Sequence, residues 1–183
     1  MKTLIVKYKS VIKFIATFLV VYILLSVTYK FYLQFSHGLK FYPDYFTHLV
    51  AIQSETLLNT FGYNTAILPH PNEPSIKLIV NGQYLARVIE GCNSISVIIL
   101  FVSFVIAFSG QLKDTVLFVL SGGVLLYVVN LLRIVMLSIG IYHFPDKSGF
   151  LHTVIFPGII YGMVFLLWMF WVNRFSKLNK KNE

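Results

Sequence analysis

The stretch that decides the fold is Thr115–Phe144, which reads TVLFVLSGGVLLYVVNLLRIVMLSIGIYHF. Within it, only Arg133 carries a full charge at neutral pH. A helix that crosses the hydrocarbon core of a bilayer needs about 20 apolar residues, and this run meets that requirement. We therefore predict a transmembrane helix over residues 115–141, with Arg133 close to one of its ends.

Three further apolar runs have the same character and predict transmembrane helices over residues 13–33, 92–111 and 152–173. The 183 residues are 57% hydrophobic and 12% charged, with a mean hydropathy of +0.75, whereas soluble domains have about 25% charged residues. Residues 1–183 are therefore predicted to form a single integral membrane domain, an all-α bundle of four transmembrane helices. This composition excludes most soluble enzymes, disordered tails and disulfide-rich secreted modules.

Basic residues gather at both ends of the chain, whose net charge is +8. They are Lys2, Lys7, Lys9 and Lys13 near the N-terminus, and Arg174, Lys177, Lys180 and Lys181 near the C-terminus. Because lysine and arginine favour the cytoplasmic side of a membrane, both termini, including the basic tail 174–183, are predicted to be cytoplasmic. Segments 34–91 and 142–151 are then extracytoplasmic. No basic stripe is present, so we expect membrane lipid as a partner and no nucleic acid.

The first apolar run has a second interpretation, because a lysine-rich start followed by apolar residues is also typical of a cleaved signal peptide. The run is long, however, and it lacks a convincing small-residue cleavage site. These two features favour an uncleaved membrane anchor over residues 13–33.

The extracytoplasmic segment 34–91 carries signals for structure of its own. An uneven distribution of apolar residues predicts an amphipathic helix over about 45–61, which we expect to lie in the membrane interface. Further along, the dipeptide Asn81-Gly82 supplies the two positive φ values that a type I′ turn needs. A β-hairpin is therefore predicted over about 75–90, and it leads directly into the second membrane helix.

Three reactive residues are predicted to lie at one depth of the membrane. Cys92 opens the second membrane helix at its outer end, and His152 opens the fourth at its outer end. Arg133 follows the inner start of the third helix by 18 residues (115 to 133), which is roughly 27 Å at 1.5 Å per residue. Three separate helices therefore bring a cysteine, an arginine and a histidine to the outer face.

This set of side chains fits cysteine acyl transfer. The thiolate is the reactive form of cysteine, and a helix N-terminus and a nearby cation favour it. His152 is a candidate base that can take the proton of Cys92 and later protonate a leaving amine. Arg133 offers fixed donors and a permanent charge for a developing oxyanion or a thiolate. We predict attack on a peptide carbonyl and a thioester intermediate.

Other residues could support this site. Asn130 lies three residues before Arg133 and so on the same helix face, which suggests an internal site. Glu90 flanks the cysteine and could orient a partner, although a solvated strand end is the plainer interpretation. His143 is a second candidate for the base, and the sequence does not distinguish it from His152. No spacing of histidine, cysteine or acidic residues suggests a metal site, and no cofactor is needed.

Less specific interpretations remain open. Cys92 could be a small apolar filler, Arg133 could snorkel to the interface and His152 could be an ordinary interfacial residue. The chain would then be a non-catalytic assembly or scaffold protein of a secretion system, in which Asn130 and Arg133 hold a partner helix. A small transporter or channel subunit that uses Arg133 as a pathway charge is a further alternative.

At these positions the sequence resembles the exosortase/archaeosortase family of membrane-embedded cysteine transpeptidases. The resemblance rests on Glu-Gly-Cys-Asn-Ser-Ile-Ser (90–96), on Asn-Leu-Leu-Arg (130–133) and on His152 followed by Gly158. It covers about residues 80–170. Each motif is weak alone, but their conjunction with the predicted topology is fairly specific.

The resemblance implies a role for each of the three residues: Cys92 as nucleophile, Arg133 as its electrostatic partner and His152 as acid and base. The chain departs from the family pattern in two respects. Many members follow the cysteine with a small residue and glycine, where this chain has Asn93 and Ser94. Many members also have about eight helices, so this chain looks like the minimal form, similar to the short F-type exosortases.

The family further implies a substrate class and a location. The expected substrates are secreted proteins with a C-terminal sorting signal, composed of a short motif, a transmembrane helix and a basic tail. The enzyme would lie in the bacterial inner membrane with its active site at the outer face. A small membrane accessory protein is a possible further partner.

Overall fold

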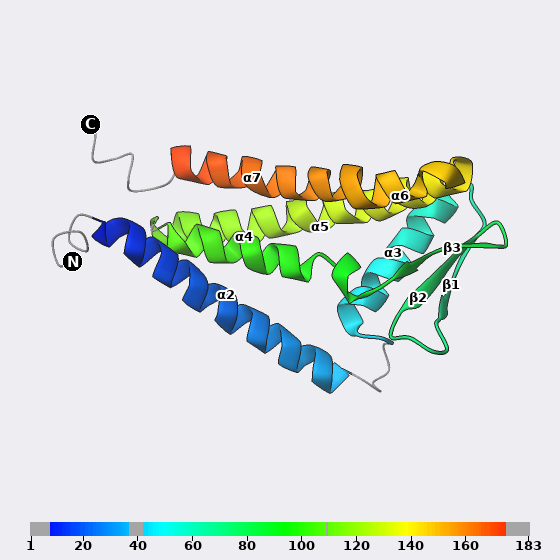
Figure 1. The fold of residues 1–183 in the computed structure, drawn as a ribbon, viewed down its shortest axis with the longest axis horizontal. Coiled ribbons are helices and arrows are strands. Elements are labelled where there is room, and N and C mark those ends of the chain that lie inside the picture. Colours follow the sequence, from blue (N-terminus) through cyan, green and yellow to red (C-terminus); the bar gives the residue numbers. More distant parts are fainter. Residues whose placement is uncertain (1–7, 37–41, 109, 175–183) are drawn as a thin grey trace.

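The computed structural model describes residues 8–36, 42–108 and 110–174 (Figure 1). A bundle of long helices occupies one end of the molecule, and a small β-sheet with one helix occupies the other (Figure 1). The N-terminal lysines Lys2 and Lys7 lie outside the described residues, as does the predicted basic tail except for Arg174.

Within the described residues, three helical stretches are long and apolar enough to cross a membrane. They are α2 (Lys9–Ser36), α5 (Leu112–His143) and the stretch Pro145–Arg174 that ends in α7 (Phe156–Arg174). The fourth predicted span corresponds to α4 (Ile95–Ala107), whose 13 residues reach roughly 20 Å at 1.5 Å per residue. A bilayer core is about 30 Å thick, so α4 alone is too short to cross it, and the count of four spans stays a prediction.

Two predicted boundaries differ from the structure. The second apolar helix begins at Ile95 and not at residue 92, because residues 90–92 form a 3-10 turn. The predicted outer connection 142–151 is largely helical: a 3-10 turn over Pro145–Lys147 is followed by α6 (Ser148–Phe150) and a π-helical turn (Leu151–Ile155). Pro145 explains this early start, since proline is favoured in the first turn of a helix.

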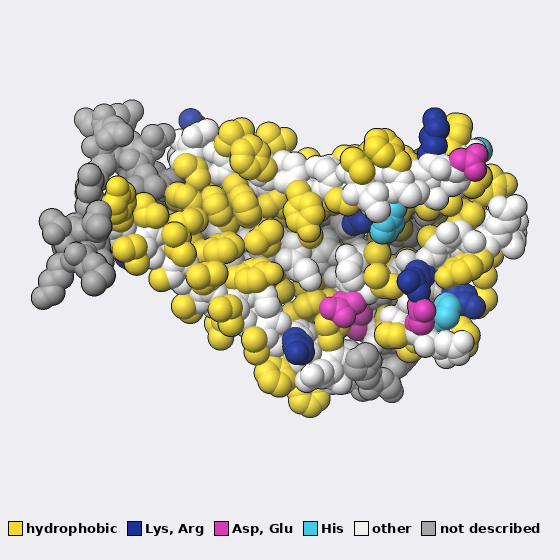
Figure 2. Space-filling model, in the orientation of Figure 1, with side chains coloured by type: hydrophobic (Ala, Val, Ile, Leu, Met, Phe, Trp, Pro, Cys, Tyr) yellow, Lys and Arg dark blue, Asp and Glu magenta, His cyan; other side chains and the backbone are white. Residues whose placement is uncertain are grey.

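The outer surface of the bundle is apolar. Figure 2 shows hydrophobic side chains over the helical part of the molecule, whereas charged side chains gather towards the sheet end. Large apolar residues are exposed on each long helix, among them Val20 on α2, Leu117 on α5 and Phe165 on α7. Such extensive apolar exposure is rare in soluble monomers and is typical of a surface that faces lipid.

Helix α4 is held inside the bundle, where it contacts α2, α5 and α7. A buried cluster joins α4, α5 and α7 around Phe101, Val105, Leu126, Val164 and Trp171. Gly122 allows α5 to pack closely against Phe101 of α4, since a Cβ atom placed there would lie 2.4 Å from Cζ of Phe101.

We expect replacement of Gly122 by alanine to lower the free energy of unfolding by about 1–3 kcal/mol, because overpacking a filled core has this cost. The adjacent Gly123 provides the matched control. A Cβ atom there would lie 4.0 Å from Cγ2 of Ile98, which is ordinary contact, so Gly123→Ala should leave stability unchanged or slightly raised. Thermal unfolding of the two purified variants distinguishes them, and equal midpoints would contradict the packing described.

The sheet has three antiparallel strands in the order β1-β2-β3. They are β1 (Thr65–Pro69), β2 (Ile76–Val80) and β3 (Gln83–Val88). The β2–β3 hairpin is the predicted one, and its turn residues Asn81 and Gly82 have φ values of 50° and 80°. Strand β1 was not predicted. It pairs with β2 and so adds a third strand to the hairpin.

Helix α3 (Tyr45–Thr60) coincides with the amphipathic helix predicted from the sequence. The side chain of Asp44 caps it by accepting a hydrogen bond from the backbone N–H of Thr47 at 3.0 Å. Val50 and Ala51 are fully buried, in a cluster with residues of the sheet and of α5. This apolar face is thus covered by protein, and the helix joins the sheet to the bundle.

Candidate functional site

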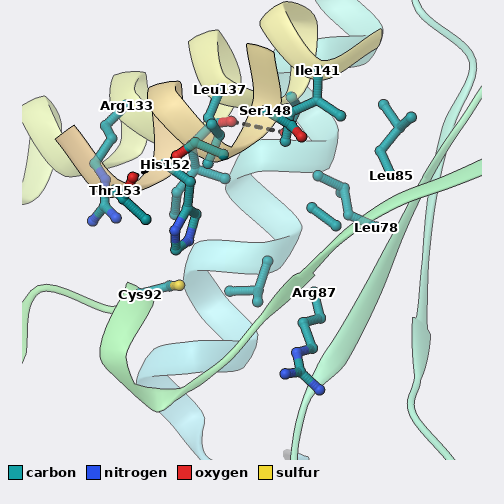
Figure 3. A pocket seen from close by; sticks show the side chains of 15 residues that line it. Leu78, Leu85, Arg87, Cys92, Arg133, Leu137, Ile141, Ser148, His152 and Thr153 are labelled. Atoms are coloured by element: carbon teal, nitrogen blue, oxygen red, sulfur yellow. Dashed lines mark hydrogen bonds between the residues drawn. The ribbon is translucent and has the colours of Figure 1, made fainter. Parts of the chain in front are cut away.

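Cys92, Arg133 and His152 line one cavity of about 350 Å³ (Figure 3). Each comes from a different element: Cys92 from the 3-10 turn after β3, Arg133 from α5 and His152 from the π-helical turn before α7. The sulfur of Cys92, the ring of His152 and Arg133 lie at the same end of the cavity (Figure 3). The structure therefore brings together the three predicted residues, which are far apart in the sequence.

The π-helical turn at His152 is an unusual local structure. Single π turns within α-helices are rare and occur frequently at functional sites. Here the turn spans Leu151–Ile155 and leaves His152 exposed to the cavity and its opening. The imidazole is thus accessible to a substrate as well as to Cys92.

Asn130 connects Arg133 to the turn that carries Cys92. The Nη1 atom of Arg133 donates to Oδ1 of Asn130 at 3.3 Å, and Nδ2 of Asn130 donates to the backbone carbonyl of Cys92 at 2.7 Å. The side chain of Asn130 is almost fully buried, with 1% exposure. This chain of hydrogen bonds positions the cysteine backbone against α5, and it places Asn130 and Arg133 on the same side of that helix.

Arg133 keeps donor capacity for a ligand. Its Nε atom is buried and has no hydrogen-bond partner among the described residues. A buried donor without a partner costs about 1–3 kcal/mol, and such groups in a native structure call for an explanation such as a catalytic role. An anionic or carbonyl oxygen that enters the cavity would satisfy this donor.

Asn93 holds the start of α4 against two other helices. It is fully buried, and its Nδ2 atom donates to the hydroxyl of Tyr29 at 2.7 Å and to Oγ1 of Thr47 at 3.2 Å. Its Oδ1 atom accepts from the backbone N–H of Ile95 at 3.0 Å. Asn93 therefore fixes the backbone directly after Cys92 and helps to position the cysteine.

Ser94 occupies the position at which many members of the resembled family have glycine. Its φ is 64°, in the left-handed region where a side chain is unfavourable and glycine is not. Its hydroxyl donates to the carbonyl of Asn93 at 2.6 Å, which offsets part of that cost. Although Ser94 replaces glycine, the backbone here keeps the left-handed conformation that glycine favours.

We expect Ser94→Gly to be more stable than Ser94→Ala by about 1–2 kcal/mol, because alanine keeps the left-handed strain and loses the hydroxyl. Ser96 on α4 is the control: within a helix, glycine is less stable than alanine by about 0.5–1 kcal/mol. Thermal unfolding of the four variants measures both differences. The same order of stability at both positions would contradict the conformation of Ser94.

The structure separates the two rival histidines. His143, the last residue of α5, makes a hydrogen bond of 2.9 Å between its Nε2 atom and the hydroxyl of Tyr63, and its ring packs edge-on against Tyr63 and Tyr142. It is not among the residues that line the cavity, whereas His152 is. His152 is therefore the better candidate for the partner of Cys92.

Glu90 lies apart from the other candidates. Its side chain is exposed at the start of the 3-10 turn. It lines two other grooves, of about 480 Å³ and 450 Å³, and not the cavity that holds Cys92. The structure thus does not place Glu90 with the three central residues.

The remaining walls of the cavity were not predicted. Arg87 on β3 reaches it and forms an ion pair with Glu73, and Ser148 and Thr153 line it from the last helical stretch. No sequence signal distinguished these residues from an ordinary strand and loop. In the described part of the chain, no group of three histidine, cysteine or acidic side chains could hold a metal ion.

Comparison with known proteins identifies the family of the chain. The family model described as transmembrane exosortase (Exosortase_EpsH) matches residues 5–171, which is nearly the whole chain. No curated protein and no solved structure gives a significant match. On the strength of the family match, the chain belongs to the transmembrane exosortase family.

Proposed function

We propose that this chain is a membrane-embedded cysteine transpeptidase that cleaves the C-terminal sorting signal of secreted proteins. Membership of the exosortase family supports a sorting-related membrane transpeptidase at the level of the family. The observation that carries the proposal for this chain is the single cavity lined by Cys92, Arg133 and His152. A nucleophile, a base and a cation with a free donor are the groups that acyl transfer requires.

The proposed reaction has two steps. The sulfur of Cys92 attacks the scissile carbonyl while His152 accepts the thiol proton, and the C–N bond then breaks as His152 returns that proton to the leaving amine. The result is a thioester on Cys92 and a released C-terminal signal. An amine acceptor or water then attacks the thioester, gives a proton to His152 and restores the thiol, so cargo is transferred or hydrolysed.

Arg133 is proposed to act on the charge that develops during both steps. The unpartnered Nε–H is available to the oxyanion of the tetrahedral intermediate, while Nη1 remains bonded to Asn130. Fixed donors of this kind cost no reorganisation when the charge appears. Asn130 is a positioning residue, since it holds the carbonyl of Cys92 and not the substrate.

The proposed location is the bacterial inner membrane, with both termini cytoplasmic and the cavity at the outer face. Arg133 follows the start of α5 at Leu112 by 21 residues (112 to 133), or roughly 32 Å at 1.5 Å per residue. This is about the thickness of the hydrocarbon core, so the two ends of this stretch can lie at opposite faces. The substrate's own transmembrane helix would then lie beside the bundle, together with any small accessory protein.

We expect Arg133→Lys to reduce processing about a hundredfold, although it keeps the positive charge. Lysine lacks the planar set of donors, so it cannot contact Asn130 and an oxyanion in the same way, and one oxyanion donor contributes about 10²–10³-fold to the rate. The readout is the ratio of intact to truncated C-terminal peptides of exported proteins in cells that carry only the variant. Full processing by the lysine variant would contradict this role. It would favour the alternative in which Arg133 is only a positive charge along a transport pathway.

A further inference from the structure

We infer that the edge of β3 beside Cys92 binds the substrate as a short added β-strand, with an apolar side chain of the substrate in the far end of the cavity. The inference rests on the proposed function and specifies its substrate: an extended peptide segment with an apolar residue at the second position before the scissile bond. Main-chain pairing at a sheet edge is a recurrent mode of peptide recognition.

The first observation is that β3 is an edge strand. The strand order β1-β2-β3 leaves one side of β3 unpaired, and within the described residues β3 pairs only with β2. An edge strand presents a row of backbone N–H and C=O groups that can pair with another chain. The strand ends at Val88, and the turn that carries Cys92 begins two residues later, so a peptide paired with β3 ends close to the thiol.

The second observation is that the cavity runs along this edge. Four successive strand residues, 85 to 88, line it. Successive side chains of a regular strand point to opposite faces of the sheet, so residues 86–88 bring the cavity to both faces of β3 beside its unpaired edge. The opposite wall is formed by α5 and by the helical stretch with His152 (Figure 3). An extended peptide therefore fits between β3 and the catalytic residues.

A β-bulge limits the length of this pairing. The register of β2 against β3 shifts so that Leu78 faces Ala86 while Ile79 faces Tyr84, which leaves Leu85 without an opposite partner. Bulges interrupt an edge and redirect a side chain, often next to active sites. We therefore assign the pairing to residues 86–88, the part of β3 nearest to Cys92.

The third observation is the apolar character of the far end of the cavity. Leu78, Leu85 and Ile141 lie there, away from Cys92 and His152 (Figure 3), and Leu137 adds to the same wall. Leu85 is half-buried in a cluster with Leu78. An apolar side chain of the substrate would cover the half-exposed Leu85 and Ile141, whereas a charged one would lose its hydration without gaining a partner.

The test uses peptide chloromethyl ketones, whose chloride is displaced by the sulfur of Cys92 to form a stable thioether. Three probes are compared on the purified full chain: acetyl-Ala-Leu-Ala chloromethyl ketone, the same compound methylated on the leucine nitrogen, and its all-alanine analogue. Rates with glutathione correct for intrinsic reactivity, and iodoacetamide reports the reactivity of Cys92 without a peptide. We expect both the methylated and the all-alanine probe to label Cys92 about tenfold more slowly than the parent, a factor that corresponds to about 1.4 kcal/mol.

A pair of matched variants tests the apolar end. Leu85→Ala should reduce the preference for the leucine probe over the all-alanine probe to less than about threefold. Leu68→Ala, the same change on an exposed residue of β1 at the opposite edge, should leave that preference intact. Equal labelling by the parent and methylated probes would overturn the strand pairing, and an unchanged preference in Leu85→Ala would overturn the apolar subsite. Processing in cells tests the proposed function separately, so the two claims can fail independently.

Discussion

Replacement of Cys92 by serine is expected to reduce processing at least about a thousandfold. The thiolate is the nucleophile of cysteine enzymes, and a serine hydroxyl ionises far less readily. Loss of the nucleophile of a catalytic set removes most of the rate, with effects up to about 10⁶-fold. The chain has one cysteine, so no second thiol can take its place. The ratio of intact to truncated sorting signals in exported proteins measures the effect.

The control for this experiment moves the thiol to a second position. In Cys92→Ser combined with Ser96→Cys, a single thiol remains, on the exposed Ser96 position of α4, which lines a different groove. This double variant should be as inactive as Cys92→Ser alone. Retained processing in Cys92→Ser would instead show that the chain acts without covalent catalysis, as a scaffold protein would.

The second large effect is expected for His152→Ala, which should reduce processing about a thousandfold. General acid–base catalysis contributes about 10²–10⁴-fold to a rate, and His152 is proposed to act in both halves of the reaction. Its side chain lines the same cavity as Cys92. In cells that carry only this variant, precursors with intact C-terminal signals should accumulate in the membrane fraction.

His143→Ala is the matched control, because it removes the same kind of side chain from the C-terminal end of α5. His143 bonds to Tyr63 outside the cavity, so its loss should leave processing within about twofold and lower stability by roughly the 0.5–1.5 kcal/mol of a typical hydrogen bond. If His143→Ala abolished processing and His152→Ala did not, the assignment of the base would have to be reversed.

Much of the arrangement could be predicted from local signals. Three of the four apolar runs correspond to described helical stretches long enough to cross a membrane, and the hairpin marked by the Asn81-Gly82 turn is confirmed by the structure. Helix periodicity placed Asn130 and Arg133 on one face, and they are hydrogen-bonded in the structure. These features depend on residues close together in the sequence, which is why the sequence alone predicts them.

Features that depend on tertiary contacts could not be predicted. The 3-10 turn at Cys92 is followed by Asn93, which is buried against α2 and α3, and no local pattern specifies those partners. Strand β1 is short and ends at Pro69, so it exists only because β2 offers an edge. The choice between His143 and His152 likewise required the position of Tyr63, which lies 80 residues from His143.

The most direct test of the central claim is the labelling of Cys92 with a membrane-impermeant maleimide at neutral pH in intact cells. Because the chain has a single thiol, the label reports one site. We predict prompt labelling from outside, and labelling several-fold slower in Arg133→Ala and His152→Ala, since both residues are proposed to favour the thiolate. Labelling confined to the cytoplasmic side in inverted vesicles, or equal rates in all three proteins, would contradict an activated nucleophile at the outer face.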